Sequence, residues 1–407
     1  MSGASFHIAV VGAGATGIAA AIAFARDGFR TALVGSLESR PDGRTVALMN
    51  GSIRFLEALG VWSSIQPDAA ALETMRLIDD SGSLFRPPPV AFRALEIDLD
   101  AFGWNVENAL LVSRLAEAAR RESFLTLFEG TATGMAASDG AASLTLSDGT
   151  VIAADLVVAA DGRRSALRVG AGIAARTWSY PQSALTTILS HDREHRETST
   201  EFHTRHGPFT LVPLPGRRSS LVWVTEPDRA KNLADLDDRA LAIAIERQAQ
   251  SMLGAMRVDG PRGVVPMSGL SVDRYWAPHL ALIGEAAHVF PPIGAQGLNL
   301  GLRDAAALRD VAVDARRQGK FLGSDETLRG YQRGRDFDVR LRTAAVDGLN
   351  RTLLTDLMPA DFMRGAGLLA VSGIGPLRRA LMREGVLPRF GAPSLMRREP
   401  RAQENRS

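Results

Sequence analysis

The order of apolar and polar positions between residues 280 and 308 predicts a short strand, a loop and then a helix. Residues 280–283 are all apolar, which is typical of a strand buried on both faces. After a loop rich in proline and glycine, apolar residues recur at the spacing of one helical face, at Leu298, Leu302, Ala305 and Leu308. Glycine lets backbone approach a flat ligand closely, and the N–H groups that begin the helix point back at that ligand. The pattern predicts a site for a ring that carries negative charge, with an ordinary strand–loop–helix connection as the alternative.

A strand–helix–strand pattern also begins the chain. Residues 6–11 and 31–34 are apolar runs of strand length, and a helical pattern ending at Gly28 lies between them. Glycines in the spacing G-x-G-x-x-G join the first strand to the helix. The first of these glycines permits a tight turn, the second lets backbone approach a pyrophosphate, and the third lets helix and strand pack closely. The pattern predicts a unit that binds a dinucleotide, FAD or NAD, with contacts from Gly12, Gly14, Thr16 and Gly17.

The dinucleotide unit departs from its usual pattern at the end of the second strand, where an acidic residue normally binds the adenosine ribose. Gly35 stands at that point, and Glu38 follows three residues later. Glu38 is therefore a candidate for the ribose hydroxyl groups, and a solvated loop carboxylate is the alternative. Arg44, in the next loop, is a candidate for a phosphate or ribose oxygen, or else a surface arginine.

A buried strand in the middle of the chain ends at Asp161 and Gly162. Residues 151–160 are mostly apolar and follow an Asp-Gly hairpin turn at 148–149. Doubly wound folds bind their ligands at the carboxyl ends of the parallel strands. A carboxylate and a glycine at that edge are therefore a second candidate contact with the dinucleotide.

The pattern changes between about residues 180 and 270. Residues 186–189, 209–214 and 220–225 are expected to be strands of an antiparallel sheet. Residues 233–252 have a helical pattern whose apolar positions include Leu236, Ala240, Ile243 and Ile245. We interpret this part as a substrate domain laid over the cofactor. After residue 283 the chain returns to the dinucleotide fold, and residues beyond about 335 have a helical pattern.

Composition excludes several kinds of chemistry. The chain has 407 residues, of which 45% are hydrophobic, enough for two domains or one large core with an insertion. It has no cysteine, which excludes disulfides, thiolate catalysis, and zinc or iron–sulfur sites with cysteine ligands. A net charge of +2 gives no overall field for nucleic acid. The uncharged run at 8–25 has no basic segment before it, so we expect a cytoplasmic protein rather than an exported or anchored one.

Histidine does not predict a metal site. His191, His195, His203 and His206 lie in one stretch, but their spacing is not that of metal ligands. His288 follows the strand at 280–283. A packed or hydrogen-bonded structural histidine is favoured there over a catalytic base.

Three motifs together resemble the FAD-binding motifs of the class A flavoprotein monooxygenases, which include p-hydroxybenzoate hydroxylase. They are the glycine motif at 12–17, Asp161-Gly162, and GEAAH at 284–288. The resemblance is closer to one branch, the UbiH, UbiF and COQ6 hydroxylases of ubiquinone biosynthesis. That branch typically has G-D-A-A-H and then H-P-x-A-G-Q-G-x-N-x-G-x-x-D, where this chain has PPIGAQGLNLGLRD at 291–304. VEN at 106–108 also resembles that branch, and the resemblance covers nearly the whole chain.

The resemblance implies an α/β fold with a doubly wound FAD-binding domain of the GR2 type, an inserted β-sheet substrate domain and a C-terminal helical segment. The FAD-binding domain is expected to be discontinuous, at 1–72, 98–178 and 272–345. The substrate domain is expected at 73–97 and 179–271, followed by C-terminal helices at 346–395 and a tail at 396–407.

The resemblance also implies which residues of the 284–304 motif contact FAD. Glu285 replaces the family aspartate that bonds the ribitol chain, and Pro292 is expected beside the flavin and the aromatic substrate. Backbone N–H groups of Gly297, Leu298 and Asn299 are expected to stabilise the anionic reduced ring. These three residues and Pro292 are therefore the predicted catalytic residues. The expected FAD contacts here are Gly284, Glu285, Ala286, Gly294, Gln296, Gly297, Leu298 and Asn299.

By this resemblance the protein is an FAD-dependent monooxygenase that hydroxylates an aromatic ring. NAD(P)H is the transient reductant, reduced flavin reacts with O2, and a flavin C4a-hydroperoxide delivers oxygen to a phenol. The expected substrate is a polyprenyl phenol of ubiquinone biosynthesis. The alternatives are a soluble aromatic substrate, or a non-catalytic relative that scaffolds a quinone-biosynthesis complex, the latter suggested by Gly35 and Glu285.

The C-terminal end adds a candidate contact surface. Between residues 376 and 402, apolar side chains are interleaved with seven arginines, against only two acidic residues, Glu384 and Glu399. Such a region can bind the anionic inner face of a membrane or a protein of the biosynthetic complex, which would suit a polyprenylated substrate. A solvated tail is the alternative. The arginines are Arg378, Arg379, Arg383, Arg389, Arg397, Arg398 and Arg401.

Overall fold

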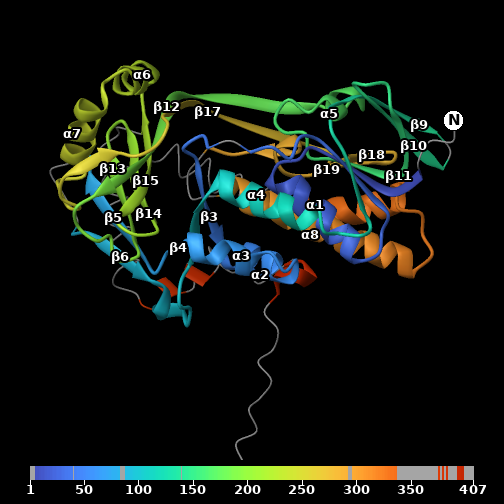
Figure 1. Ribbon diagram of the computed structural model, residues 1–407, viewed down its shortest axis with the longest axis horizontal. Coiled ribbons are helices and arrows are strands. Elements are labelled where there is room, and N and C mark those ends of the chain that lie inside the picture. Colours follow the sequence, from blue (N-terminus) through green and yellow to red (C-terminus); the bar gives the residue numbers. More distant parts are fainter. Residues whose placement is uncertain are drawn as a thin grey trace, which may run out of the picture.

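The computed structural model describes residues 5–39, 41–82, 88–138, 140–291, 296–336, 375, 378–379, 382–383 and 392–397. Figure 1 shows two lobes, one built on a sheet with long helices and the other on a sheet with short helices. Two long antiparallel strands, β12 (Ala175–His191) and β17 (Gly263–Val272), run between the lobes.

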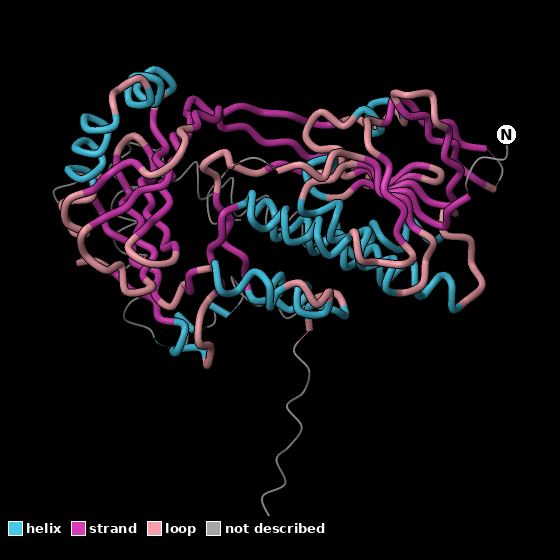
Figure 2. The backbone as a smooth tube through the Cα atoms, in the orientation of Figure 1, coloured by secondary structure: helices cyan, strands magenta, loops and turns pink. Residues whose placement is uncertain are grey.

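The first lobe contains a parallel sheet, which Figure 2 shows fanned out nearly end-on. Its strands follow the order β19-β11-β1-β2-β8, and all neighbours in this series are parallel. Every residue of β2 and β19 is buried, as expected for strands covered on both faces. This arrangement confirms the predicted α/β class. The strands are β1 (Ser5–Val11), β2 (Thr31–Val34), β8 (Leu125–Phe128), β11 (Val151–Ala159) and β19 (Leu280–Leu282).

Three helices pack side by side on one face of this sheet (Figure 1). They are α1 (Ala15–Arg26), α4 (Asn108–Ala119) and α8 (Gln296–Arg317). Ala19, Ala20 and Ala21 of α1 are fully buried, and such small side chains let neighbouring helices and strands approach closely. The strands β9 (Ala132–Ser138), β10 (Ala141–Leu146) and β18 (Trp276–Ala277) and the helix α5 (Ala166–Gly170) complete the lobe.

The second lobe contains a mixed sheet in the order β20-β17-β12-β15-β14-β13-β5-β6. The pairings β12–β15, β14–β15 and β13–β14 are antiparallel as predicted, whereas β13 and β5 are parallel. The strands added here are β5 (Thr74–Asp80), β6 (Val90–Arg93), β13 (Thr198–Thr204), β14 (Gly207–Leu214), β15 (Arg218–Thr225), β16 (Met256–Val258) and β20 (His288–Val289).

A small three-stranded sheet lies between the lobes, and the two short helices near it pack against α8 and α4 of the first lobe. The sheet has the order β3-β7-β4, from β3 (Thr45–Met49), β4 (Ala70–Ala71) and β7 (Gly103–Glu107). The helix α2 (Asn50–Ala58) follows β3 directly, and α3 (Trp62–Ile65) packs against α2. Short 3-10 helices are η1 (Gln66–Asp68), η2 (Ala94–Ile97), η3 (Gly284–Ala286) and η4 (Ser394–Met396).

The helix predicted over 233–252 has other bounds in the structure, because one helix ends at the beginning of this stretch and a second, shorter one lies within it. They are α6 (Pro227–Ala234) and α7 (Asp238–Gln248). The Asp237 side chain accepts a hydrogen bond of 2.7 Å from the Ala240 N–H group and so begins a new helix. Leu236 at the break and Ile243 on α7, two of the apolar positions in the predicted pattern, are 36% and 41% exposed.

Most of the expected C-terminal helical segment lies outside the described residues. In the part that is described, η4 packs against α2 and α8, and Met396 is 4% exposed. The Ser394 N–H group donates a hydrogen bond of 2.6 Å to the Asp310 carboxylate of α8. Within the described residues, no helix is both long and apolar enough to cross a membrane.

Candidate functional site

The G-x-G-x-x-G segment forms the turn between β1 and α1. Gly12 has a φ of +112°, and a Cβ placed on it would lie 2.2 Å from the Ala160 carbonyl oxygen, so no other residue fits without displacement. A Cβ on Gly17 would lie 1.9 Å from the Gly12 carbonyl oxygen. Gly14 is the N-cap of α1, which has neither a side-chain cap nor an acidic residue in its first turn. A Cβ on Gly14 would meet nothing within 4 Å, so the helix N-terminus is open to an external anion.

Asp161 and Gly162 follow β11 and lie beside this turn. The Asp161 N atom is 2.9 Å from the position of a Cβ on Gly12. One carboxylate oxygen of Asp161, Oδ2, accepts a hydrogen bond of 3.4 Å from the Leu167 N–H group. The other, Oδ1, is buried and has no hydrogen-bond partner in the described part of the chain. A buried acceptor in this position needs a donor from a water molecule or a ligand, and the open space at Gly162 leaves room for one.

Thr16 brings the N-terminal motif against the 284–304 motif. A Cβ on Gly301 of α8 would lie 2.6 Å from the Thr16 Oγ1 atom and 3.3 Å from the Gly284 Cα atom. A Cβ on Gly284 would lie 3.3 Å from the Thr16 Cγ2 atom. The first turn of α1, the 3-10 helix η3 and the first turns of α8 therefore meet around one threonine side chain. Two of the three motifs singled out in the sequence converge here, and Asp161 adjoins them through Gly12.

A fully buried ionic network supports η3 and α8. The Asp304 carboxylate accepts hydrogen bonds from the Gly284 N–H group at 2.9 Å and from the His288 Nε2 atom at 2.6 Å, and its Oδ1 atom is 2.7 Å from the Arg335 Nε atom. Asp304 and Arg335 are 0% exposed and His288 is 1% exposed. Burial alone would raise the pKa of Asp304, but the charges of His288 and Arg335, with the hydrogen bonds, hold it below its ordinary value. These contacts support the interpretation of His288 as a hydrogen-bonded structural residue.

Asn299 connects α8 to the small sheet. Its Oδ1 atom accepts hydrogen bonds from the Met49 N–H group at 2.9 Å and from the Ser52 hydroxyl at 2.7 Å, and its Nδ2 atom donates to the Ala47 carbonyl at 2.8 Å. The side chain is thus committed to protein partners, and the predicted ring contact of Asn299 stays a prediction.

The other residues of this loop lie at or beside the beginning of α8. Gln296, Gly297 and Leu298 form its first turn with Asn299 and are partly exposed, and a Cβ on Gly297 would meet nothing within 4 Å. N–H groups in the first turn of a helix have no acceptor within that helix, as the prediction requires. Pro292 and Gly294 lie outside the described residues, so their assignments stay predictions.

Arg168 helps to hold the candidate cofactor site together, and the sequence analysis did not identify it. It is 6% exposed, and its guanidinium donates to the Ala286 carbonyl at 2.8 Å and to the Arg163 carbonyl at 2.9 Å. Arg168 therefore ties the loop after Asp161 to η3. No local signal could reveal this contact, because Ala286 lies far along the chain. Glu285, also in η3, is exposed and has no hydrogen-bond partner among the described residues.

The residues predicted to bind the adenosine end of the cofactor do not converge on one point, unlike those of the glycine turn and η3. Gly35 has a φ of +148°, and a Cβ on it would lie 2.8 Å from the Ala13 N atom, so an acidic side chain does not fit at the usual position. Glu38 is exposed, and its N–H group donates to the Ser36 hydroxyl at 3.3 Å. Arg44 is exposed and forms an ion pair of 2.5 Å with Asp42. The contacts of Glu38 and Arg44 with a cofactor stay predictions.

The four clustered histidines have separate partners. His191 contacts the Ser219 hydroxyl at 3.0 Å, and His195 the Leu214 carbonyl at 2.9 Å. His203 pairs with Glu201 at 2.7 Å, and His206 with Glu226 at 2.6 Å. Across the described ranges, no group of three or more histidine or acidic side chains is arranged to hold a metal ion.

These observations define a cofactor site at the carboxyl edge of the parallel sheet. It offers an open helix N-terminus for a pyrophosphate, a buried carboxylate oxygen without a donor, and a second helix N-terminus at α8. A dinucleotide with a ring system at one end has the groups that this arrangement needs. FAD is such a molecule, and the described residues fit it.

Comparison with known proteins agrees with this site. Residues 5–319 match the model of a family described as FAD binding domain. The chain is 34% identical over 386 residues to ubiquinone hydroxylase UbiL of Rhodospirillum rubrum, covering 93% of this chain and 89% of that one. It is 32% identical over 385 residues to 3-demethoxyubiquinol 3-hydroxylase of Escherichia coli, covering 93% and 97%. The crystal structure of p-nitrophenol 4-monooxygenase PnpA from Pseudomonas putida has a similar fold, with a TM-score of 0.77, 17% identity, and coverage of 94% and 98%.

Proposed function

Because the chain belongs to the FAD-binding-domain family and is an FAD-dependent monooxygenase, we propose that it hydroxylates the ring of a polyprenyl phenol in ubiquinone biosynthesis. The observation that carries this proposal is the convergence of the glycine turn, Asp161 and η3 on one edge of the sheet. Relatives that are similar over nearly their whole length are named as ubiquinone hydroxylases, which supports the class of substrate.

Each part of the site has a distinct part in holding FAD. The open N-terminus of α1 at Gly14 would bind the pyrophosphate, and the unpaired Oδ1 atom of Asp161 would accept a hydrogen bond from the cofactor. Glu285 would lie along the ribitol chain, where its exposed carboxylate could accept hydrogen bonds from the ribitol hydroxyl groups. The N–H groups of Gly297 and Leu298 would face the ring and stabilise negative charge on it. When bound and reduced, FAD would supply the activation of dioxygen, one oxygen atom of which enters the phenol ring while the other leaves as water.

The substrate sheet offers an apolar surface on the side of the cofactor. The Thr45 hydroxyl of β3 donates to the Ser220 hydroxyl of β15 at 2.8 Å, which identifies the face of the sheet turned toward the cofactor lobe. Val222 lies on the same face of β15, and Val212 of β14 is opposite Ser220. Apolar side chains on this face suit an aromatic ring with a hydrocarbon tail and help to exclude water during the reaction.

The experiment that tests the substrate is a deletion of the gene in the source organism, followed by mass spectrometry of its quinones. A polyprenyl phenol that lacks one ring hydroxyl should accumulate, and its structure identifies the carbon that is hydroxylated. A normal quinone profile would contradict the proposed pathway.

The chemistry is tested separately with purified protein. NADH or NADPH should be oxidised faster when the accumulated phenol is present, and oxygen from labelled O2 should enter the product. If protein purified with added FAD remains colourless, the alternative of a non-catalytic scaffolding relative is favoured instead. If soluble phenols are hydroxylated and the polyprenyl phenol is not, the substrate class is wrong while the monooxygenase chemistry stands.

We also propose a peripheral contact with an anionic membrane through the C-terminal arginines. Arg378 and Arg383 are poor positions for a test because they already have partners in the protein: Arg378 forms a largely buried ion pair of 2.6 Å with Glu96, and Arg383 an exposed one of 3.0 Å with Asp98. The test is therefore replacement of Arg389, Arg398 and Arg401 by Gln, measured by co-sedimentation with anionic and neutral vesicles. Weaker binding to the anionic vesicles alone is expected, and unchanged binding would remove the proposal.

A further inference from the structure

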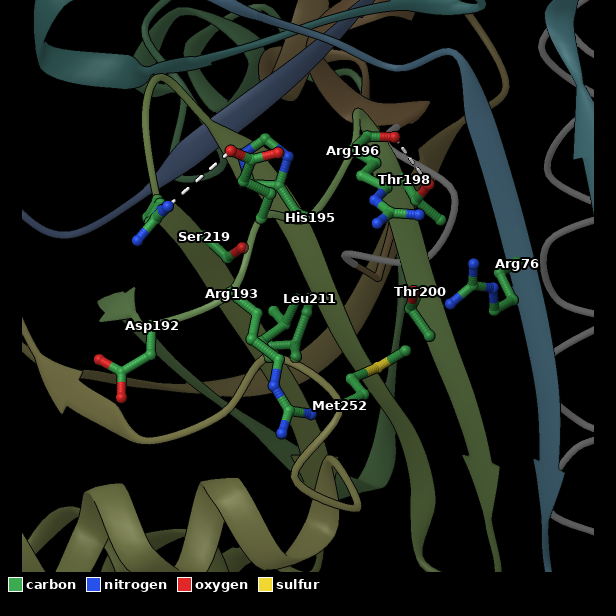
Figure 3. A pocket seen from close by; sticks show the side chains of 13 residues that line it. Arg76, Asp192, Arg193, His195, Arg196, Thr198, Thr200, Leu211, Ser219 and Met252 are labelled. Atoms are coloured by element: carbon green, nitrogen blue, oxygen red, sulfur yellow. Dashed lines mark hydrogen bonds and ion pairs between the residues drawn. The ribbon is translucent and has the colours of Figure 1, made fainter.

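A cavity of about 520 Å³ lies in the second lobe, on the face of the sheet that α7 covers (Figure 3). Leu211 of β14 lines the cavity and packs in one cluster with Leu241 and Ile245 of α7. Thr200 of β13 is opposite Leu211, and Arg76 of β5 is opposite Thr200, so all three side chains are on this face. The face that contacts β3 through Ser220 is the other one. The cavity is thus separated from the candidate cofactor site by the sheet.

Arg76 and Thr200 line the cavity with polar groups that receive no side-chain hydrogen bond or ion pair from the described residues. Figure 3 shows the Arg76 side chain turned from β5 toward Thr200. Arg76 is half-buried, and none of the described residues gives its guanidinium a hydrogen bond or an ion pair. Thr200 is 3% exposed, and its hydroxyl also has no hydrogen-bond partner in the described part of the chain. A half-buried cation without a partner is unfavourable, so an anion from outside the chain would stabilise this arrangement.

Two loops with unusual backbone form the wall of the cavity. Arg196 and Glu197 in one loop, and Gln250 and Ser251 in the other, all have φ values between +49° and +53°. Left-handed backbone is unfavourable for residues other than glycine, and where surrounding contacts maintain it the position is often part of a ligand site. Here the contacts are direct, because the Arg193 N–H group donates to the Leu253 carbonyl at 2.9 Å. The two loops are held against each other in conformations that keep the cavity open.

The charge of the lining favours an anion with two negative charges. Arg76, Arg193, Arg196 and Arg217 line the cavity against Asp192 and Glu194, which leaves a net charge of +2. Arg217 and Glu194 are 3.9 Å apart and are 60% and 69% exposed, so their pairing is weak and easily displaced. The volume is in the range of small-molecule sites and exceeds what a lone inorganic ion fills.

We propose that this cavity binds a phosphate group, carried by a small metabolite or by a lipid headgroup. The Arg76 guanidinium would bind two phosphate oxygens, and the Thr200 hydroxyl would donate to one of them. The three arginines at the rim would attract the ligand and contact the rest of it. No step of the proposed hydroxylation uses this site, so it is an additional binding function rather than part of the cofactor site.

The test uses the full-length protein loaded with FAD, at low ionic strength. Glycerol 3-phosphate is titrated by calorimetry, and the rise in the unfolding temperature at saturating ligand is measured in parallel. Arg76→Gln should weaken binding at least tenfold, and Arg76→Lys should weaken it less, because it keeps the charge but loses the planar fork. Arg239→Gln is the matched control, since Arg239 is an exposed arginine of α7 that does not line the cavity. It should bind as the unchanged protein does.

Two further measurements distinguish a lipid headgroup from a soluble metabolite as the source of the phosphate, and check that each variant is folded. Vesicles that contain phosphatidic acid should retain the unchanged protein more than Arg76→Gln if the group belongs to a lipid. Equal retention together with selective loss of glycerol 3-phosphate binding assigns it to a soluble metabolite. The flavin content of each variant should equal that of the unchanged protein, which shows that the fold is intact. If Arg76→Gln and the unchanged protein bind both probes equally, or if neither probe binds, the proposal is wrong.

Discussion

Asp304 positions the elements of the candidate cofactor site although it is not itself one of the predicted cofactor contacts. Its carboxylate is fully buried and holds η3 through Gly284, β20 through His288 and the chain beyond α8 through Arg335. Its pKa is held below the ordinary value, so it is ionised in the folded protein down to a lower pH than in the unfolded chain. Its contribution to the free energy of unfolding is therefore complete above about pH 4 and is lost as the pH falls below that value.

Replacement of Asp304 by Asn should destabilise the protein by about 3 to 5 kcal/mol, because the buried Arg335 guanidinium then loses its counter-charge. The measurement is chemical denaturation at pH 7 and at several lower values, where the difference from the unchanged protein should shrink below about pH 4. Asp325→Asn is the control, since it removes a carboxylate from an exposed pair with Arg329. A difference between Asp304→Asn and the unchanged protein that stays constant with pH would contradict this explanation.

Gly17→Ala is predicted to prevent the close approach of α1 to the turn. Its Cβ would lie 1.9 Å from the Gly12 carbonyl oxygen, so either the helix or the turn must move and FAD binding should fall by at least tenfold. The dissociation constant of FAD is measured by quenching of its fluorescence. Gly170→Ala at the end of α5 is the matched control, because a Cβ there meets nothing within 4 Å. Equal affinity for FAD in both variants would show that close packing at Gly17 is not required.

At the scale of elements, the split between α6 and α7 shows where hydrophobic periodicity misleads. The apolar spacing continues across residues 233–252, but an N-cap acts locally and begins a new helix wherever its side chain satisfies a free N–H group. The same limit explains β12, which was expected only at 186–189 and extends from Ala175 to His191. Its first half has no alternating apolar pattern, because it pairs with β17 between the lobes instead of covering a core.

Replacement of Asp237 by Ala should lower the free energy of unfolding by about 1 kcal/mol, the usual contribution of an N-cap side chain. Urea denaturation measures the change. Asp235→Ala is the comparison, since Asp235 is at the end of α6 and its side chain caps no N–H group. If the two variants are equally stable, the Asp237 contact with Ala240 is not what separates the helices.

At the scale of the whole molecule, the cofactor site takes parts from segments far apart in the chain. The glycine turn, Asp161, η3 and the beginning of α8 come together because parallel strands place their carboxyl ends on one edge. The small sheet then connects this edge to the substrate lobe, through Asn299 on one side and Ser220 on the other. A ligand that occupies the edge should therefore stabilise both lobes.

Removal of FAD should lower the unfolding temperature. The difference in stability between the protein with FAD and the protein without it should grow with the concentration of free FAD. At a free concentration of about 100 times the dissociation constant, the expected contribution is about 2.7 kcal/mol. Scanning calorimetry measures it, and riboflavin is the control, because it lacks the pyrophosphate that Gly14 and α1 are expected to bind. Equal stabilisation by riboflavin and FAD would contradict the assignment of α1 to the pyrophosphate.

The sequence by itself determined the α/β class, the strand–turn–helix units and the motifs that bind a dinucleotide. These follow from local rules, since periodicity reports which face is buried and glycine spacing reports where backbone must turn or approach closely. Only the tertiary structure decided that Thr16 joins two motifs, that Asp304 and Arg168 fix η3, and that Asp161 keeps an unsatisfied oxygen. Each of these depends on contacts between residues that are distant in the chain. No spacing rule encodes such contacts, because the packing of the folded core sets them.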